Sequence, residues 1–443
     1  MKSWLKKGMT VVICGALALG LAACGSTGGG SNEPEDGSGG GGGSKDGAGK
    51  TEMTFQIWDT GQKAGMEALV DAYVAEHQNV SIEVQVTNWG EYFTKLEAAA
   101  TSNTMPDIFW MHTNEIFKYA DNGMLADCTD IVETEHYSDI SLQNCKGSDG
   151  KLYGVPKDKD FVALTYSKKI FDEAGVEYPN EDWTWDDLIS ASEQIYEKTG
   201  KYGYLAYLDD QIGYWNFIYQ AGGYILNEDG TQAGYTQPGT NKAMKFFVGV
   251  QDNDWCPKQD TFAETSPQDL FFSERAAMLL QGNYMFLGEC NDNPNMNGEW
   301  DVAVLPKCPD PVSGDGRATI SNGLCYATSA KGKNKEAAME FIKWLGTEEA
   351  QRIQGESGAA IPAYVGLEDT WLSTFEKNGY KLSLEPLMDM FDYSVQSPNN
   401  ASRPQWKTPV ADELLKVYSG DQDIDTALQN MQNIVDEAIA KGN

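Results

Sequence analysis

The chain has 443 residues, with 66 acidic and 33 basic side chains, and its net charge is −33 at pH 7. Nucleic-acid affinity depends on Lys and Arg side chains that neutralise phosphates, so this balance argues against DNA or RNA as a partner. It disfavours anionic ligands more weakly, and an acidic surface keeps a protein soluble. The length exceeds what one hydrophobic core usually organises, so we expect two lobes.

The chain begins with the features of a secretory signal peptide. A basic start precedes an apolar run over 9–21, which is shorter than the roughly 20 apolar residues that span a bilayer. The run ends in Leu-Ala-Ala-Cys over 21–24, which resembles the bacterial lipobox. The resemblance implies that residues 1–23 are removed and that Cys24 is lipidated. The alternative is an ordinary signal peptide followed by an incidental cysteine.

A glycine-rich segment without aromatic residues follows, GSTGGGSNEPEDGSGGGGGSKDGAGK over 25–50. This composition cannot bury enough apolar surface to fold and is typical of a flexible linker. We therefore interpret residues 24–50 as a tether with an r.m.s. reach of about 30 Å. It would hold a folded module outside the cell.

The first folded stretch alternates between strand and helix patterns. Strand patterns cover 53–57, 82–86 and 105–110, and amphipathic helical patterns cover 66–74, 91–102 and 116–120. This order predicts a parallel sheet with helices on its faces. Ligands of such sheets bind at the carboxyl ends of the strands. The side chains expected there are Trp58, Asp59, Trp110 and His112.

Further along the chain, a series of stretches carries a resemblance to a known family. The most specific is NTMPDIFWMHTNEIFKYADNGMLADCTDIV over 103–132, and the others cover 150–176, 183–195, 214–223, 274–286 and 318–345. In this order they resemble family 1 extracellular solute-binding proteins, the sugar-binding lipoproteins of ABC importers related to maltose-binding protein. The resemblance implies an α/β fold with two lobes and a ligand cleft between them, each lobe a mostly parallel sheet flanked by helices. Lobe one is expected at 51–159 and 321–370, and lobe two at 160–320 and 371–443.

The expected ligand site follows from the chemistry of a neutral sugar. Aromatic rings cover its C–H faces, while carboxylates, amides and guanidinium groups bind its hydroxyls. The resemblance places Trp110 and Trp406 at stacking positions and Tyr284 where relatives usually have Trp. The full expected set is Trp58, Asp59, Gln62, Trp110, His112, Asp160, Trp215, Tyr284, Asn322, Arg403 and Trp406. The competing interpretations are core packing for the aromatic residues, helix capping for His112 and a turn for Asp59.

Six cysteines remain after Cys14 leaves with the signal peptide and Cys24 takes lipid. An exported protein can form disulfides, although spacing alone does not choose the pairs. Cys128 and Cys145 flank a predicted surface loop, and we expect a disulfide between them. The absence of a CxxC motif and the presence of only three histidines lead us to expect no metal and no cofactor.

The expected function is capture of a sugar or oligosaccharide and its delivery to an ABC importer, without enzymatic activity. The expected partners are a carbohydrate, the ABC permease and the membrane, with the protein a lipid-anchored monomer at the extracellular face of the bacterial cell membrane. One alternative is a binding protein of this fold for a polyamine or a peptide. Another is a secreted glycoside hydrolase, which would use two carboxylates across the scissile bond.

Replacing Cys24 with alanine tests the lipid anchor. Each buried acyl CH₂ contributes about 0.8 kcal/mol of membrane affinity, so C24A should lose lipid labelling and most of its membrane retention. Metabolic labelling with a fatty acid, followed by membrane fractionation, measures both. Cys14→Ala is the matched control and should keep the label. Undiminished lipid incorporation in C24A would contradict the assignment.

Overall fold

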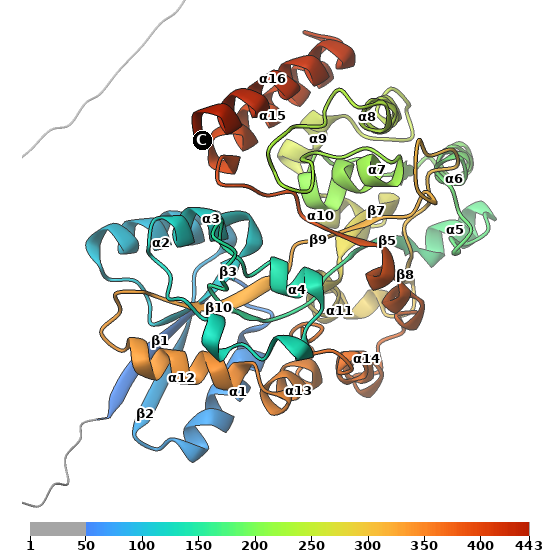
Figure 1. Ribbon diagram of the computed structural model, residues 1–443. Coiled ribbons are helices and arrows are strands. Elements are labelled where there is room, and N and C mark those ends of the chain that lie inside the picture. The colour runs from blue at the N-terminus through green and yellow to red at the C-terminus, as the bar shows by residue number, and fades with distance from the viewer. Residues whose placement is uncertain (1–49, 443) are drawn as a thin grey trace, which may run out of the picture. The chain divides into compact units, whose positions relative to one another are not determined.

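The computed structural model describes residues 50–442, which form one compact unit. The expected signal peptide, the lipidation site Cys24 and nearly all of the tether lie outside the described residues. Two sheets, each with its own hydrophobic core, organise the compact unit (Figure 1). None of the helices over 50–442 combines the length and the apolar character needed to cross a membrane.

The first lobe is built around a five-stranded sheet in the order β2-β1-β3-β10-β4. Its strands are β1 (Thr51–Ile57), β2 (Val80–Val86), β3 (Ile108–His112), β4 (Val155–Pro156) and β10 (Leu324–Thr328). Strand β1 runs parallel to β2 and β3, whereas β10 is antiparallel to β3 and β4. The associated helices are α1 (Lys63–Glu76), α2 (Trp89–Ser102), α3 (Thr113–Asp121), α4 (Asp139–Gln143), α12 (Lys335–Leu345) and α13 (Glu348–Glu356). The predicted β-α-β-α-β order of this lobe is confirmed.

The second lobe is built around a four-stranded sheet in the order β6-β7-β5-β8. Its strands are β5 (Val162–Ser167), β6 (Tyr202–Tyr204), β7 (Ala276–Gly282) and β8 (Trp300–Ala303). A separate pair joins β9 (Thr319–Ser321) to β11 (Ser394–Gln396). The remaining α-helices are α5 (Lys168–Ala174), α6 (Trp185–Thr199), α7 (Trp215–Gln220), α8 (Pro238–Val250), α9 (Gln259–Glu264), α10 (Pro267–Phe272), α11 (Phe286–Asp292), α14 (Glu368–Lys377), α15 (Arg403–Tyr418) and α16 (Ile424–Gly442).

Strand direction in the second sheet departs from the mostly parallel arrangement that we expected. Strand β5 is antiparallel to both β7 and β8, and only β6 and β7 run parallel. β5 enters this sheet directly from the first lobe, so the crossover, rather than a local β-α-β unit, sets its direction. The two-lobed α/β fold class itself is confirmed.

Local sequence accounts for the helix ends and faces that frame the lobes. Helix α6 begins with a capping box, in which Thr184 Oγ1 accepts from the Asp187 amide and Asp187 accepts from the Thr184 amide at 2.8 Å. Helix α16 buries one apolar stripe and lies beside α15 (Figure 1). This stripe forms part of the hydrophobic core of the second lobe. Its buried side chains include Leu428, Met431 and Val435.

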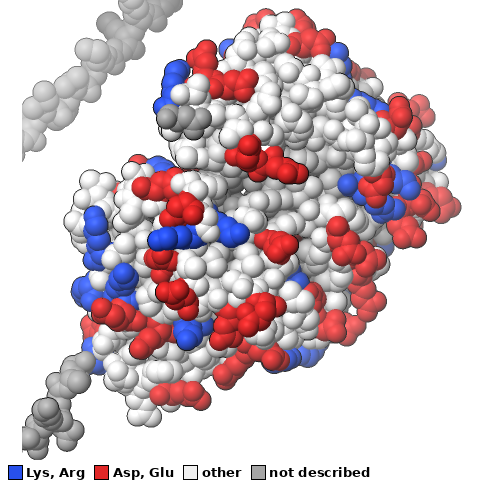
Figure 2. Space-filling model, viewed as in Figure 1, with Lys and Arg blue, Asp and Glu red and all other residues white. Residues whose placement is uncertain are grey.

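Acidic side chains are spread over both lobes on the face shown in Figure 2, where they are not gathered into one patch. Many of the lysines on the surface lie beside a carboxylate, as in the pair of Lys95 with Glu91 at 2.7 Å. Such exposed pairs contribute at most about 1 kcal/mol each. The surface charge is therefore mainly a solvating feature.

The expected disulfide between Cys128 and Cys145 is wrong. All six cysteines of the described residues are free and buried. Cys128 Sγ donates to the carbonyl of Ala126 at 3.5 Å, and Cys145 Sγ donates to the carbonyl of Ser141 at 3.3 Å. The spacing suggested a surface loop, but both thiols are packed in the core of the first lobe.

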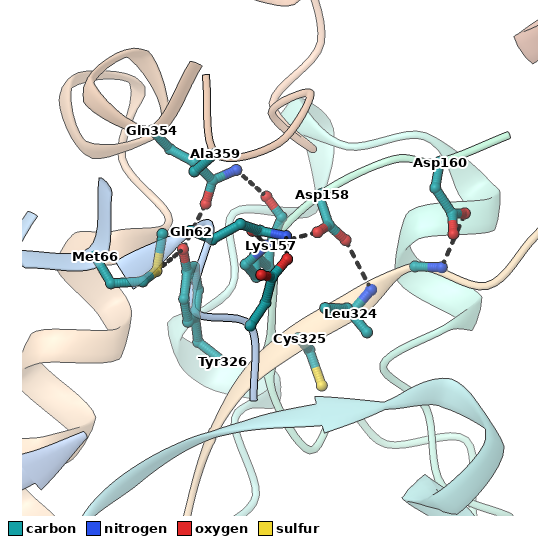
Figure 3. Close-up of polar contacts among 12 residues, drawn as sticks. Gln62, Met66, Lys157, Asp158, Asp160, Leu324, Cys325, Tyr326, Gln354 and Ala359 are labelled. Atoms are coloured by element: carbon teal, nitrogen blue, oxygen red, sulfur yellow. Dashed lines mark hydrogen bonds and ion pairs between the residues drawn. The ribbon is translucent and has the colours of Figure 1, made fainter. Parts of the chain in front are cut away.

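A buried ion pair stands where the chain passes from the first lobe to the second. Lys157 Nζ lies 2.6 Å from Asp158 Oδ2, with no exposed surface on the lysine side chain. The same nitrogen donates to Gln62 Oε1 at 3.0 Å and lies 4.4 Å from the centre of the Trp110 ring. Figure 3 shows Gln62, Lys157 and Asp158 converging on one another.

The ion pair ties together chain segments that are far apart in sequence. Asp158 Oδ1 accepts from the Leu324 amide at 2.9 Å, at the start of β10. Gln354 Nε2, at the end of α13, donates to the Lys157 carbonyl at 2.8 Å (Figure 3). The segment that leaves the first lobe at Lys157 and the segment that returns to it at Leu324 are therefore held together at this point.

Asp158→Ala should strongly destabilise the protein because it leaves the Lys157 ammonium buried without its carboxylate. Breaking a buried pair in this way typically costs about 3–5 kcal/mol of unfolding free energy. Denaturant unfolding measures the change. Glu91→Ala removes an exposed pair and is the matched control, with an expected loss of at most about 1 kcal/mol. Equal small losses in both variants would contradict this role for the pair.

Candidate functional site

A cavity of about 730 Å³ is lined by residues of both lobes. The first lobe contributes the carboxyl ends of β1 and β3 together with Trp89, the first residue of α2. The second lobe contributes Asp209–Ile212, the turn after β7 and the first turns of α11. We call this cavity the cleft. Its position agrees with the rule that ligands bind beyond the carboxyl ends of strands.

A second cavity, of about 820 Å³, lies at the amino-terminal ends of β1 and β2 and includes Glu52 and Glu83 in its lining. It is slightly larger than the cleft, but none of the described residues that line it is aromatic. The cleft combines rings with converging carboxylates and amides, so its chemistry makes it the better candidate despite the smaller volume.

Seven of the eleven predicted site residues line the cleft. They are Trp58, Asp59, Gln62, His112, Asp160, Tyr284 and Asn322. The other four do not line it, and each is at least 98% buried: Trp110, Trp215, Arg403 and Trp406. The expectation that these four contact the ligand therefore needs correction, and their packing explains why.

Trp110 fills the core behind the cleft because β3 is buried along its whole length. Its ring lies 5.0 Å from that of Trp58, which separates it from the cavity surface, and Lys157 covers it from another side. Trp110 therefore supports the ring that lines the cleft instead of forming the lining itself.

In the second lobe, Trp215 and Trp406 pack against the guanidinium group of Arg403. The guanidinium carbon lies 5.0 Å and 5.3 Å from the two ring centres. Arg403 Nη2 in turn donates to Asp210 Oδ2 at 2.8 Å, and Asp210 lines the cleft. The three residues therefore position a cleft carboxylate from one layer behind it.

Rings from both lobes face the cleft. Trp58 and Trp89 meet edge to face with ring centres 5.2 Å apart, and Trp89 lies 5.4 Å from the His112 ring. Trp89 is 52% exposed, more than any other tryptophan among residues 50–442. On the opposite side, Tyr284 donates from its hydroxyl to Gln211 Oε1 at 3.3 Å.

The sequence reasoning missed Trp89, although a signal for it was present. Trp89 follows the carboxyl end of β2 by three residues, so the rule that selected Trp58 and His112 would have selected it too. Asp209, Asp210, Gln211 and Lys407 were also missed. The first three belong to an irregular helical turn near Asp210–Tyr214, for which no strand pattern gave a signal.

Asp160 holds the crossovers together. Its Oδ1 accepts from Ser321 Oγ at 2.9 Å and from the amides of Asn322 and Gly323 at 2.7 and 3.1 Å, while Oδ2 accepts from Gln211 at 3.1 Å. Burial, reinforced by the Asp158 charge, raises the pKa of Asp160 to about 6 against these hydrogen bonds. Most of its acceptor capacity is thus used within the protein.

Asp59 and His112 have the local structural roles that were considered as alternatives to ligand binding, a turn for Asp59 and a helix cap for His112. Asp59 Oδ1 accepts from the Gly61 amide at 2.8 Å, as a turn residue does. His112 caps α3, with Nδ1 accepting from the Asn114 amide at 3.1 Å. Both residues still line the cleft, so the local role fixes each side chain there.

Three partly buried carboxylates in the cleft have shifted pKa values. Burial and the neighbouring Asp210 charge raise the pKa of Asp209 to about 6. Burial opposes ionisation of Asp210 as well, but Arg403 and Lys407 outweigh it and lower the pKa. Burial and the Asp292 charge raise the pKa of Glu289 to about 7. Within residues 50–442, no group of three or more His, Cys, Asp or Glu side chains is arranged to hold a metal ion.

Relatives of known function span almost the whole chain. A galactooligosaccharide-binding protein of Bacillus subtilis is 25% identical over 435 residues, covering 96% of this chain and 95% of the relative. A maltodextrin-binding protein of the same organism is 22% identical and covers 98% of each chain.

Solved structures have the same fold. An ABC substrate-binding protein of Listeria monocytogenes, in complex with cycloalternan, superposes with a TM-score of 0.77 at 25% identity, covering 88% of this chain and 99% of that one. A cyclic alpha-maltosyl-1,6-maltose binding protein of Arthrobacter globiformis gives a TM-score of 0.72 at 26% identity, covering 89% of this chain and 100% of that one.

The sequence profile of the family described as bacterial extracellular solute-binding protein matches residues 58–352. This match includes strands of both sheets and most of the cleft lining, and it confirms the resemblance seen in the sequence. The chain is a member of the bacterial extracellular solute-binding protein family.

Proposed function

We propose that this protein captures an oligosaccharide in the cleft and delivers it, chemically unchanged, to an ABC importer. The observation that carries the proposal is the composition of the cleft. Trp58 and Trp89 face it from the first lobe and Tyr284 from the second, with carboxylates and amides between them. Sugars need both kinds of group, because each ring presents apolar faces and a polar rim.

The arrangement of the polar groups supports a neutral, polyhydroxylated ligand. Asp209, Asp210 and Glu289 can accept hydrogen bonds from hydroxyls, and Gln62 and Asn114 can donate as well as accept. The cleft lining contains more acidic than basic side chains, so an anionic ligand such as a uronic acid would meet repulsion. The volume of about 730 Å³ lies within the usual range for small-molecule sites.

The ligands after which the relatives are named support the same ligand class. Galactooligosaccharide, maltodextrin and cycloalternan are all oligosaccharides, although they differ in linkage. We therefore propose an oligosaccharide ligand without assigning its linkage. The proposal extends to a monomer that is lipid-anchored at Cys24 on the extracellular face of the membrane and docks on the permease subunits of the importer.

Trp89→Ala tests the stacking surface. Truncating an exposed aromatic that stacks on a ligand typically costs 2 kcal/mol or more of binding, which is about a thirtyfold rise in Kd. A thermal-shift screen with maltotriose, galactotriose and other oligosaccharides first identifies a sugar that binds. Calorimetry with that sugar then measures the variant, whose melting temperature without sugar should stay close to that of the parent protein.

Two further variants serve as controls for Trp89→Ala. Trp89→Phe keeps a ring and should retain most of the affinity. Trp406→Ala removes a core side chain and should cost about 3–5 kcal/mol of folding stability. Unchanged affinity in Trp89→Ala would refute the stacking role, and a panel in which no oligosaccharide binds would refute the ligand class.

A further inference from the structure

Asn322 lines the cleft from the crossover between β9 and β10 and is only 3% exposed. Its backbone amide donates to Asp160 Oδ1 at 2.7 Å, which fixes the residue in place. Its side-chain Nδ2 lies 3.3 Å from His112 Nε2. Its Oδ1 is buried and has no hydrogen-bond partner among the described residues.

The protonation of His112 decides which end of that amide faces the imidazole. Burial lowers the pKa of His112 to about 3, with the charges of Arg403 and Lys407 acting in the same direction and Asp210 opposing them. The ring is therefore neutral and carries one proton. Since Nδ1 accepts from the Asn114 amide at 3.1 Å, that proton is on Nε2.

A protonated Nε2 is a donor, so it requires an acceptor in front of it. Of the two ends of the Asn322 side chain, only the carbonyl oxygen can accept, whereas the NH₂ group would place two donors face to face. The oxygen and the nitrogen of an amide are nearly equivalent in shape, and exchanging them turns the oxygen toward His112 and satisfies the Nε2 proton. After this exchange the NH₂ group occupies the buried position of Oδ1, which has no partner among the described residues.

We propose that His112 holds the Asn322 side chain so that its NH₂ group is presented to the ligand as a buried hydrogen-bond donor. The proposal rests on the proposed sugar-binding function for the identity of the ligand, but not for the orientation of the amide. A buried donor without a partner is costly, so the site selects a ligand with an acceptor oxygen at this point, such as a ring, glycosidic or hydroxyl oxygen. Carboxylates elsewhere in the cleft accept hydrogen bonds from ligand hydroxyls, whereas the Asn322 NH₂ group donates one to a ligand oxygen.

In this scheme His112 is a positioning residue, because it acts on the ligand through Asn322. Its own position is set by the first turn of α3, whose free amide at Asn114 fixes the tautomer. The start of α3, the His112 imidazole and the Asn322 amide therefore form one chain of hydrogen bonds that ends in the lining of the cleft.

Nuclear magnetic resonance of the sugar-free protein tests the orientation directly. The chain has only three histidines, His77, His112 and His136, so ¹⁵N signals of the imidazoles can be assigned with single variants. We expect His112 to keep the Nε2–H tautomer without titrating between about pH 8 and about pH 5, where an ordinary histidine would change charge. A coupling across the hydrogen bond should connect its N–H to Asn322 Cγ. An Nδ1–H tautomer, or an ordinary titration, would overturn the proposal.

Binding measurements test the donor role with an oligosaccharide that the thermal-shift panel selects. Asn322→Asp keeps the shape but removes the donor, and we expect a rise in Kd of at least about tenfold. His112→Phe should produce a comparable rise because it releases the amide, and His112→Gln should restore part of the affinity. The Asn322→Asp and His112→Phe changes should be strongly non-additive in the double variant.

The outcomes of the two experiments separate the inference from the proposed function. Additive losses, or full affinity in Asn322→Asp, would overturn the donor role while leaving sugar binding intact. If no oligosaccharide binds, the proposed function fails, and the imidazole spectrum still decides whether His112 orients Asn322.

Discussion

The ion pair between Lys157 and Asp158 is the interaction on which the rest of the structure depends. A charge removed from water is stable only when its partners are close and well oriented, so this pair fixes the segments that supply them. Asp158 holds the returning crossover through the Leu324 amide, and Gln354 holds the outgoing one through the Lys157 carbonyl. By holding these segments together, the ion pair sets how the two walls of the cleft are placed relative to one another.

The same network reaches the ligand site. Gln62 bonds Lys157 through its oxygen and Asp59 through its nitrogen, at 3.0 Å in each case, and both Gln62 and Asp59 line the cleft. A ligand that contacts this part of the cleft would therefore act on side chains already coupled to the crossovers. This arrangement suits a protein whose lobes close around a ligand, because hinge motion moves the short segments between packed elements.

The large aromatic residues around the cleft form two layers, one in the lining and one behind it. Trp58, Trp89 and Tyr284 line the cleft, whereas Trp110, Trp215 and Trp406 lie behind it. The rear layer holds charged side chains in position: Trp110 packs on Lys157, and Trp215 and Trp406 pack on Arg403. Buried cations gain from contact with ring faces, so this layer supports the polar groups of the cleft as well as the core.

Local sequence is enough to encode the order of strands and helices in the first lobe, the capping box of α6 and the apolar stripe of α16, and it identifies the family. These features depend on local periodicity and on motifs read along the chain. It also placed Trp58, Asp59 and His112 at the cleft, because the ends of neighbouring strands meet at one edge of a sheet. Tertiary structure decided which tryptophans reach the surface, the direction of β5 and the burial of Cys128 and Cys145. A ring at a strand end is exposed or buried according to what packs over it, and segments far away in the sequence supply that packing.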